Sequence, residues 1–251
     1  FNQTDFFLRN LQSITKIFTK TATSVSQNII HVGTYVGDGF VSEAISNGVR
    51  LTNIQDKRIK LKHGMTGGFI VIRPKNEIIA KLSSEIAFDR CATGKEKSIH
   101  KYSIKKGMIG SFSSSTLGVN AIKDFLKGAA FVFQKAPINN DLKNKEFFCS
   151  QFSTWCLQLA ESKIVMELVN QDLPLNGKII IPEFNELPSN KIGQAVDQWA
   201  FNIAKKHKKL FQKYISIKLD AKNTTPQRLY GFILEHEELF EHAMVVIPPQ
   251  E

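Results

Sequence analysis

The segment 148–160 constrains the fold of this chain more than any other part of the sequence. Its apolar residues recur at helical spacing, so that they share one face: Phe148, Phe152, Trp155, Cys156 and Leu159. The pattern predicts an amphipathic helix that begins at Cys149 and buries this face. Free N–H groups and the positive end of the helix dipole favour a thiolate at such a position. Two interpretations stay open here, a reactive thiol or a small core residue beside Phe148.

A second constraint is the stretch 29–49, in which two β-rich runs flank Gly37-Asp38-Gly39. This arrangement predicts a β-hairpin. If those three residues form the loop, Gly33 pairs with Glu43. Because side chains alternate between the faces of a strand, His31, Gly33 and Glu43 then share one face. His31 and Glu43 are diagonal neighbours in this register, and Gly33 leaves room above them.

A histidine beside a carboxylate can deprotonate a nucleophile and then stabilise the resulting imidazolium. In the predicted register His31 and Glu43 form such a pair, whereas a slip of one residue would separate them. The alternative is an exposed histidine and a solvated glutamate. Cys149 supplies the nucleophile that the first interpretation requires.

The chain has 251 residues, of which 33 are basic and 23 acidic, and its formal net charge is +10. This length allows one large domain or two small ones with a full core. The charge favours attraction to anionic surfaces such as nucleic acid, phospholipid or cell wall. The alternative is a solubilising surface charge, because the lysines are scattered. The densest cluster is Lys205-Lys206-His207-Lys208-Lys209.

The three cysteines are an odd number and show no zinc-binding spacing. We therefore expect no disulfide scaffold, no metal site and no cofactor. Cys91 and His100 lie too far apart to suggest a site. The sequence has no apolar run near 18 residues, which argues against a membrane span and for a soluble protein. The first residue is Phe rather than Met, which indicates a trimmed N-terminus and leaves secretion open.

Further elements follow from periodicity and turn residues. Helices are predicted over 5–20, 119–134 and 191–215, and a last one with Pro226 in its first turn. Strands are predicted over 67–73, 178–181 and 243–247. The stretch 107–118 is small and polar, and we expect a flexible loop that borders the site. It lacks the lysine of a phosphate-binding loop.

A helix is also expected to follow the strand 67–73, with Pro74 in its first turn. The apolar residues at helical spacing would form its buried face: Ile78, Ile79, Leu82, Ile86 and Phe88.

Three blocks of the sequence, taken together, resemble a known family. They are His-Val-Gly through Gly-Val at 31–49, Phe-Cys-Ser-Gln at 148–151 and Thr-Pro-Gln-Arg-Leu-Tyr at 225–230. The combination is similar to the circularly permuted branch of the NlpC/P60 superfamily. That branch contains the YiiX-like bacterial proteins and the lecithin:retinol acyltransferase-like enzymes. Its histidine precedes its cysteine, the reverse of the order in papain, and the same order is found here.

The resemblance implies an α+β, permuted papain-like fold in which an antiparallel sheet packs on the cysteine-bearing helix. The match covers the blocks 29–73, 147–160 and 224–247. We therefore expect a single domain over 1–251, with helical insertions at 74–145 and 191–215.

The resemblance also implies roles for individual residues. Cys149 would be the nucleophile, His31 its general base and Glu43 the group that orients the base. The N–H of Cys149 would help to bind the oxyanion, and further residues on the substrate side would be Gln151, Gly33 and Tyr35. The reaction would cleave an amide, ester or thioester through a thioester intermediate, by hydrolysis or acyl transfer.

The expected partner is an acyl-bearing substrate, either a peptide, a lipid or a cell-wall amide or ester, together with an anionic membrane surface. Nucleic acid is not favoured, because the chain lacks a basic stripe with interleaved aromatic residues and any reading motif. A second hypothesis is a papain-like fold without activity. Such a protein would be a basic binding module for an anionic lipid or protein partner.

Overall fold

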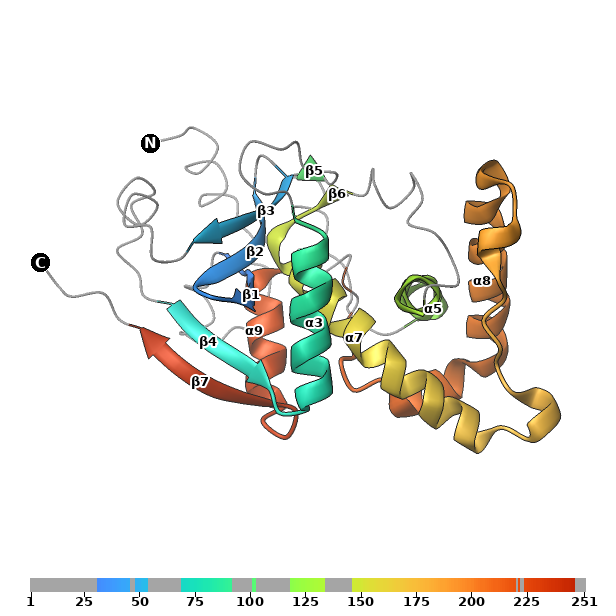
Figure 1. Cartoon of the computed structure of the whole chain (residues 1–251). Helices are drawn as coiled ribbons and strands as arrows, with labels where there is room; N and C mark the ends of the chain where they lie inside the picture. The colour runs from blue at the N-terminus through green and yellow to red at the C-terminus, as the bar shows by residue number, and fades with distance from the viewer. Residues whose placement is uncertain are drawn as a thin grey trace, which may run out of the picture.

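A computed structural model of the chain describes residues 31–45, 48–53, 69–91, 101–102, 118–133, 146–219, 221 and 224–246. Helix α7 (Cys149–Asp172) is its central element (Figure 1). The first half of α7 packs against a small β-sheet and helix α3 (Glu77–Asp89). The second half packs against helices α5 (Val119–Val132) and α8 (Ser189–Tyr214). The described residues are therefore an α+β protein, as the sequence predicted.

The small sheet has the order β1-β2-β3 and is antiparallel throughout. Its strands are β1 (Thr34–Gly37), β2 (Phe40–Ile45) and β3 (Gly48–Asn53). The predicted hairpin is confirmed, but its turn is shorter than expected. Asp38 and Gly39 form the turn with positive φ angles of 51° and 76°, and the register shifts between Tyr35 and Gly37. A two-residue turn with positive φ angles at both positions matches the right-handed twist of the flanking strands.

The sheet packs on α7 through a core formed by the predicted apolar face of the helix. The buried members of this core are Ala44, Val49, Ala87, Phe152, Trp155, Cys156 and Leu159. The helix start at Cys149 and the burial of this face are thus both confirmed. A hydrogen bond of 2.9 Å from the hydroxyl of Ser42 to the carbonyl of Ala87 joins β2 to α3.

The opposite face of α7 is also buried, which the amphipathic pattern did not predict. Polar side chains on that face bond to the backbone of the segment that follows α8. Gln158 donates to the carbonyls of Ile217 and Leu219, and Ser150 donates to the carbonyl of Thr224 over 2.6 Å. Burial of these polar residues is tolerated because each such bond satisfies a group that would otherwise lose its water.

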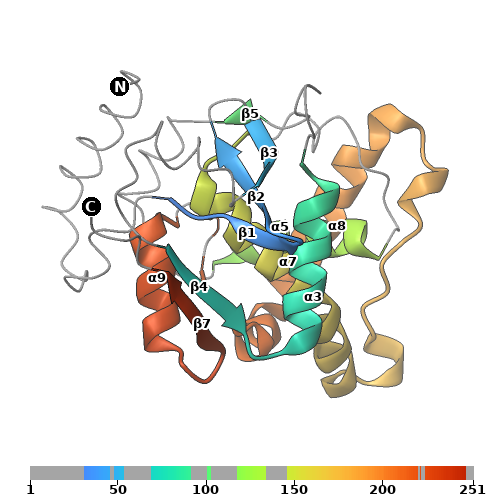
Figure 2. The same ribbon diagram turned by 60° about the vertical axis from the view of Figure 1, so that its left-hand side comes forward.

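A second small sheet pairs β4 (Phe69–Pro74) with β7 (Phe240–Val246) in antiparallel fashion. Helix α9 (Pro226–Glu235) lies beside this pair (Figure 2). The buried residues that join them are Ile217, Leu219, Leu229, Phe232, Ile233 and Phe240. Thr225 caps α9 and Pro226 lies in its first turn, as predicted. The last predicted strand, 243–247, is present but begins three residues earlier. A short parallel pair, β5 (Lys101–Tyr102) with β6 (Glu146–Phe147), precedes α7.

Two local predictions are wrong. Pro74 ends β4 instead of opening a helix, because Asn76 caps α3 by accepting from the N–H groups of Ile78 and Ile79. As a result Ile78 and Phe88 are 55% and 50% exposed, whereas Ser83 and Ala87 are buried.

The strand expected over 178–181 is absent, and that stretch lies between 3-10 turns η2 (Leu175–Gly177) and η3 (Phe184–Glu186). The side chain of Asn170 bonds to both the N–H and the carbonyl of Ile179, and so takes the place of a strand partner.

The helices predicted over 119–134 and 191–215 are confirmed as α5 and α8. That they are insertions in a single domain stays a prediction. The helix over 5–20, His100 and the loop 107–118, apart from Gly118, lie outside the described residues. Within the described part of the chain, every helix is too short or too polar to cross a membrane.

Candidate active site

His31 and Glu43 meet on the face of the hairpin where the sequence placed them. His31 Nε2 and Glu43 Oε2 lie 2.5 Å apart, and their side chains are 29% and 15% exposed. The register Thr34↔Ser42, extended by one residue, sets Gly33 opposite Glu43. The predicted diagonal pair is therefore confirmed as a contact. Its catalytic role stays a prediction.

Gly33 allows the two strands to approach closely beneath this pair. A Cβ atom at position 33 would lie 2.3 Å from Cγ1 of Val41 and 3.4 Å from Cβ of Glu43. The first distance is far below van der Waals contact, so any side chain at this position would push Val41 away. Gly33 thus holds the backbone spacing that brings Glu43 under His31.

Cys149 is the first residue of α7 and is 4% exposed. The N-cap residue of α7 is Phe148, which offers no side-chain acceptor, and the first turn contains no acidic residue. By contrast, Asn76 caps α3 and Thr225 caps α9 through side-chain oxygens. The N–H groups at the start of α7 therefore have no side-chain cap, and the positive end of the helix is directed at the sulfur.

His31 lies between Glu43 and Cys149. Burial lowers the pKa of His31 and is the largest single effect, but the charge of Cys149, a hydrogen bond with that thiol and the contact with Glu43 together outweigh it. They raise the pKa of His31 from 6.5 to about 10. Because Nε2 faces Glu43, the nitrogen available to the sulfur is Nδ1.

The Cys149 thiol shows the complementary change. Burial raises its pKa, but the charge of His31 and hydrogen bonds from His31 and from the backbone at Val32 and Ser150 outweigh burial, so that the pKa falls below 9.0. A thiol with a lowered pKa beside an imidazole with a raised one is stable as a thiolate–imidazolium pair. Such a pair can attack an electrophilic carbon at neutral pH.

A second contact joins the hairpin to α7 one helical turn away from this pair. The hydroxyl of Thr34 donates to the hydroxyl of Ser153 over 3.2 Å. Ser153 lies four residues after Cys149, hence on the same side of the helix, and Thr34 lies three residues after His31. Sequence reasoning missed these two residues and the backbone donors of Val32 and Ser150. The helical spacing of four residues from Cys149 was a signal that could have found Ser153, whereas strand alternation places Thr34 on the face opposite to Gly33 and gave no such signal.

Two predicted substrate-side residues lie elsewhere. Two residues along a helix turn a side chain by about 200°, so Gln151 lies on the side of α7 opposite to Cys149. It is 2% exposed, and its Oε1 has no hydrogen-bond partner among the described residues. Tyr35 is 52% exposed, and its hydroxyl accepts from Gly39 N–H at the hairpin turn. It lies four positions after His31, a span of about 13 Å in extended chain.

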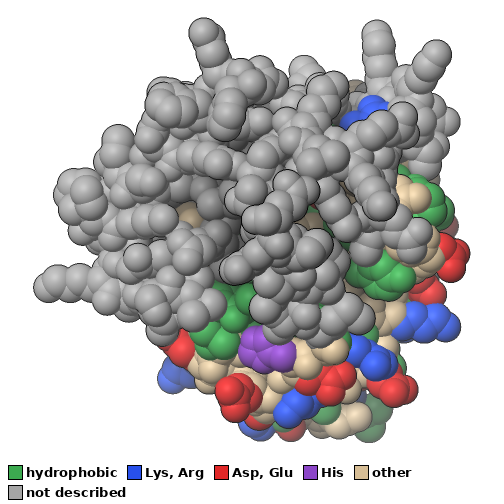
Figure 3. All heavy atoms as spheres, turned by 90° about the vertical axis from the view of Figure 1, so that its left-hand side faces the viewer, with side chains coloured by type: hydrophobic (Ala, Val, Ile, Leu, Met, Phe, Trp, Pro, Cys, Tyr) green, Lys and Arg blue, Asp and Glu red, His purple; other side chains and the backbone are tan. Residues whose placement is uncertain are grey.

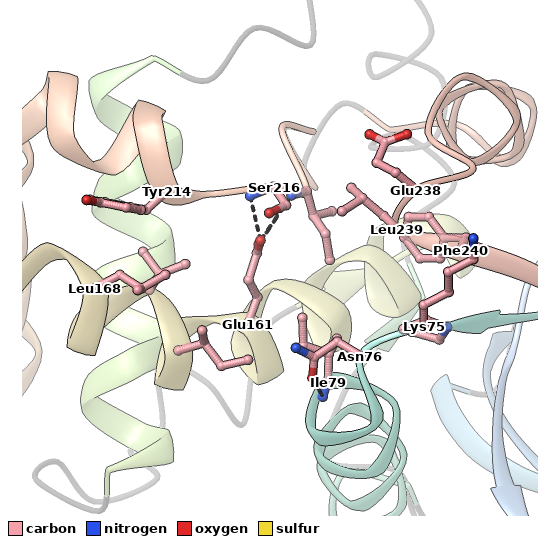
Figure 4. A pocket seen from close by; sticks show the side chains of 14 residues that line it. Lys75, Asn76, Ile79, Glu161, Leu168, Tyr214, Ser216, Glu238, Leu239 and Phe240 are labelled. Carbon is pink, nitrogen blue, oxygen red and sulfur yellow. Dashed lines mark hydrogen bonds between the residues drawn. The ribbon is translucent and has the colours of Figure 1, made fainter.

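Glu161 is a further buried carboxyl group on α7, well away from the cysteine. It accepts from the N–H groups of Ser216 and Ile217, and it lines a pocket of about 150 Å³ together with Ile79, Leu168 and Phe240 (Figure 4). Burial raises the pKa of Glu161 to about 7, against the opposite effect of these bonds. Twelve residues of helix span about 18 Å, so this pocket is separate from the Cys149 site.

The chain was compared with protein-family models, with characterised proteins and with solved structures, and none of these comparisons gave a match. The geometry around Cys149 and the resemblance of the three sequence blocks are therefore the two indications of a function.

Proposed function

We propose that this protein is a cysteine-dependent hydrolase or acyltransferase with a permuted papain-like arrangement. The observation that carries this proposal is the position of His31, which contacts Glu43 at 2.5 Å and interacts with Cys149 at the start of α7. Nucleophile, base and orienting carboxylate are the three parts of a catalytic triad. The histidine precedes the cysteine in the chain, and the strand that follows it belongs to the sheet on α7, which is the permuted order.

In the first step the Cys149 thiolate attacks the carbonyl carbon of an amide, ester or thioester. The C–O π electrons move to oxygen, and the N–H of Cys149, which has no acceptor within the helix, donates to that oxyanion. When the tetrahedral intermediate collapses, the bond to the leaving group breaks. The His31 imidazolium gives its proton to the departing amine, alkoxide or thiolate, and a thioester on Cys149 remains.

In the second step neutral His31 takes a proton from water or from an acceptor alcohol or amine. The activated oxygen or nitrogen attacks the thioester carbon, and the C–S bond breaks to return the thiolate. Glu43 stabilises the imidazolium that forms and holds the ring with Nδ1 towards the sulfur. Water as acceptor gives hydrolysis, and any other acceptor gives acyl transfer.

The test is the pH dependence of Cys149 alkylation by iodoacetamide, followed by mass spectrometry so that Cys91 and Cys156 are read separately. We expect the parent thiol to react well below the ordinary thiol pKa of about 8.5. His31→Ala should abolish this reactivity, with Cys149→Ala as the blank. His236→Ala is the matched control, because His236 also contacts a carboxylate, Glu238 at 2.8 Å, in an exposed pair at the end of α9. A slow Cys149 that does not respond to His31→Ala would overturn the proposal.

A further inference from the structure

Helix α8 carries a large share of the positive charge of this chain. It contains six lysines and a single acidic residue, Asp197, and so accounts for half of the net charge of +10. Its buried side faces α5 and α7 through Ile192, Val196, Ala200, Ala204 and Phe211. The charge is therefore concentrated on the outward side of the helix, which forms one edge of the molecule in Figure 1.

The outward side of α8 presents no acidic group. Asp197 turns towards α5, where it contacts Lys127 at 2.6 Å and Lys123 at 3.4 Å. Lys213 pairs with Asp172 at 2.8 Å. Lysines 205, 206, 208 and 209 are all exposed and have no ion-pair partner among the described residues. They flank a break in the helix at His207, whose backbone angles are not helical.

Large apolar side chains are also exposed on α8 and on the link that leads into it. In the link 173–188, which leads into α8, Leu175 is 92% exposed and Ile180 is 78% exposed. The link returns along α8, where Phe184 packs on Trp199 with ring centroids 5.8 Å apart (Figure 1). On α8 itself Phe201 is 39% exposed and lies four residues before Lys205, on the same side of the helix.

We propose that α8 and the link 173–188 form a face that binds the surface of an anionic phospholipid bilayer. Lysines 205, 206, 208 and 209 would contact the phosphate groups, and Leu175, Ile180 and Phe201 would enter the boundary between headgroups and acyl chains. Clustered lysines beside exposed apolar side chains are the composition of a peripheral membrane surface. Nucleic acid fits less well, because this face has no arginine. Its exposed aliphatic side chains also have no role in binding nucleic acid, where bases stack on aromatic rings or arginine.

The opposite side of the molecule differs from this face. Figure 3 shows that acidic and basic side chains are interspersed there among the described residues. Arg73, for example, lies 4.0 Å from Glu241 and 3.8 Å from Glu77. On the proposed face the exposed lysines 205, 206, 208 and 209 lie on α8, and the two glutamates, Glu183 and Glu186, lie in the link. A matched charge change on α3 provides a control.

The experiment is co-sedimentation of the full chain with vesicles of phosphatidylcholine, with and without a quarter of phosphatidylglycerol, at low and at physiological ionic strength. We expect binding only to the anionic vesicles and weaker binding at the higher salt. Each lysine at such a surface contributes about fivefold to partitioning, so Lys205→Glu/Lys209→Glu should weaken binding by at least tenfold. Leu175→Ser/Ile180→Ser should also weaken it severalfold, because these two apolar side chains would enter the bilayer. Both are solvent-exposed in the unbound protein.

The control Lys75→Glu/Lys81→Glu makes the same change of net charge on exposed residues of the α3 side, and it should weaken binding less than twofold. Thermal unfolding of each variant provides a readout of folding that does not depend on Cys149. An equal loss in the control, equal binding to neutral vesicles, or no binding at all would overturn the proposal. Tighter binding to a short DNA duplex than to the vesicles, lost in Lys205→Glu/Lys209→Glu, would assign the face to nucleic acid instead.

Discussion

Thr34 donates a hydrogen bond to Ser153 over 3.2 Å, across a sequence separation of 119 residues. Thr34 lies three residues after His31, and Ser153 lies four residues after Cys149. The bond therefore fixes the hairpin on α7 next to the thiol without touching the sulfur. The contact between imidazole and thiol depends on this docking, since both groups are held by separate elements.

Thr34→Val removes this bond and keeps the shape of the side chain. A lost hydrogen bond of this kind costs about 1 kcal/mol, and we expect the midpoint of Cys149 alkylation to rise by up to about 0.7 pH units. The shift should be smaller than that of His31→Ala. Ser84→Ala is the control, because Ser84 bonds the same hairpin, at the carbonyl of Tyr35, from α3 rather than from α7. Equal midpoints in Thr34→Val and the parent would show that this bond does not position the pair.

Glu43→Gln removes the negative charge next to His31. Because Glu43 raises the pKa of His31, the variant should have a less basic imidazole and, in turn, a Cys149 thiol with a higher pKa. The rate of Cys149 alkylation at neutral pH should fall, and its midpoint should move towards that of an ordinary thiol. Measurement of the full pH profile separates this effect from unfolding, which would expose Cys156 to the reagent as well. A profile identical to that of the parent would remove Glu43 from the triad.

Gly33→Ala places a methyl group 2.3 Å from Cγ1 of Val41. Overpacking of this kind lowers the free energy of unfolding by about 1–3 kcal/mol, and Cys149 should also react more slowly as the strands separate. Val41→Ala in the same chain removes the clashing atom. The double variant should therefore be more stable than the sum of the two single changes predicts, as measured by urea unfolding. Strict additivity would mean that the close approach at Gly33 does not limit the hairpin.

Glu161→Gln tests the buried carboxyl on α7. Its folded-state pKa of about 7 is above the value of 4.5 for a free glutamate, so the folded protein holds the proton more tightly. The stability that this proton provides is complete below pH 4.5 and is lost as the pH rises through 7, by up to about 3 kcal/mol. The variant should therefore gain stability relative to the parent between pH 5 and pH 8.

Urea unfolding at several pH values measures this difference. Glu167→Gln is the control, because Glu167 lies on the same helix with an exposed side chain. If both variants follow the parent at every pH, the carboxyl of Glu161 does not titrate as burial predicts.

The local elements of this fold were predictable because their signals lie within a few residues of one another. Gly37, Asp38 and Gly39 supply the positive φ angles that a tight hairpin needs, and this turn together with strand alternation predicted that His31 and Glu43 would meet. The apolar period after Cys149 predicted both the start and the buried face of α7. The local signal failed at Pro74, which was assigned to the first turn of a helix but ends β4, because Asn76 caps the helix that follows.

The sequence by itself determined the hairpin, the helix start and the residue types that make Cys149, His31 and Glu43 a chemically sensible set. Only the tertiary structure decided that the hairpin lies on α7 with Thr34 against Ser153. It also decided that the polar face of α7 is buried, because Gln158 and Glu161 bond to backbone more than fifty residues away. Periodicity reports how one element divides between core and solvent, whereas contacts between distant segments depend on how several elements pack together.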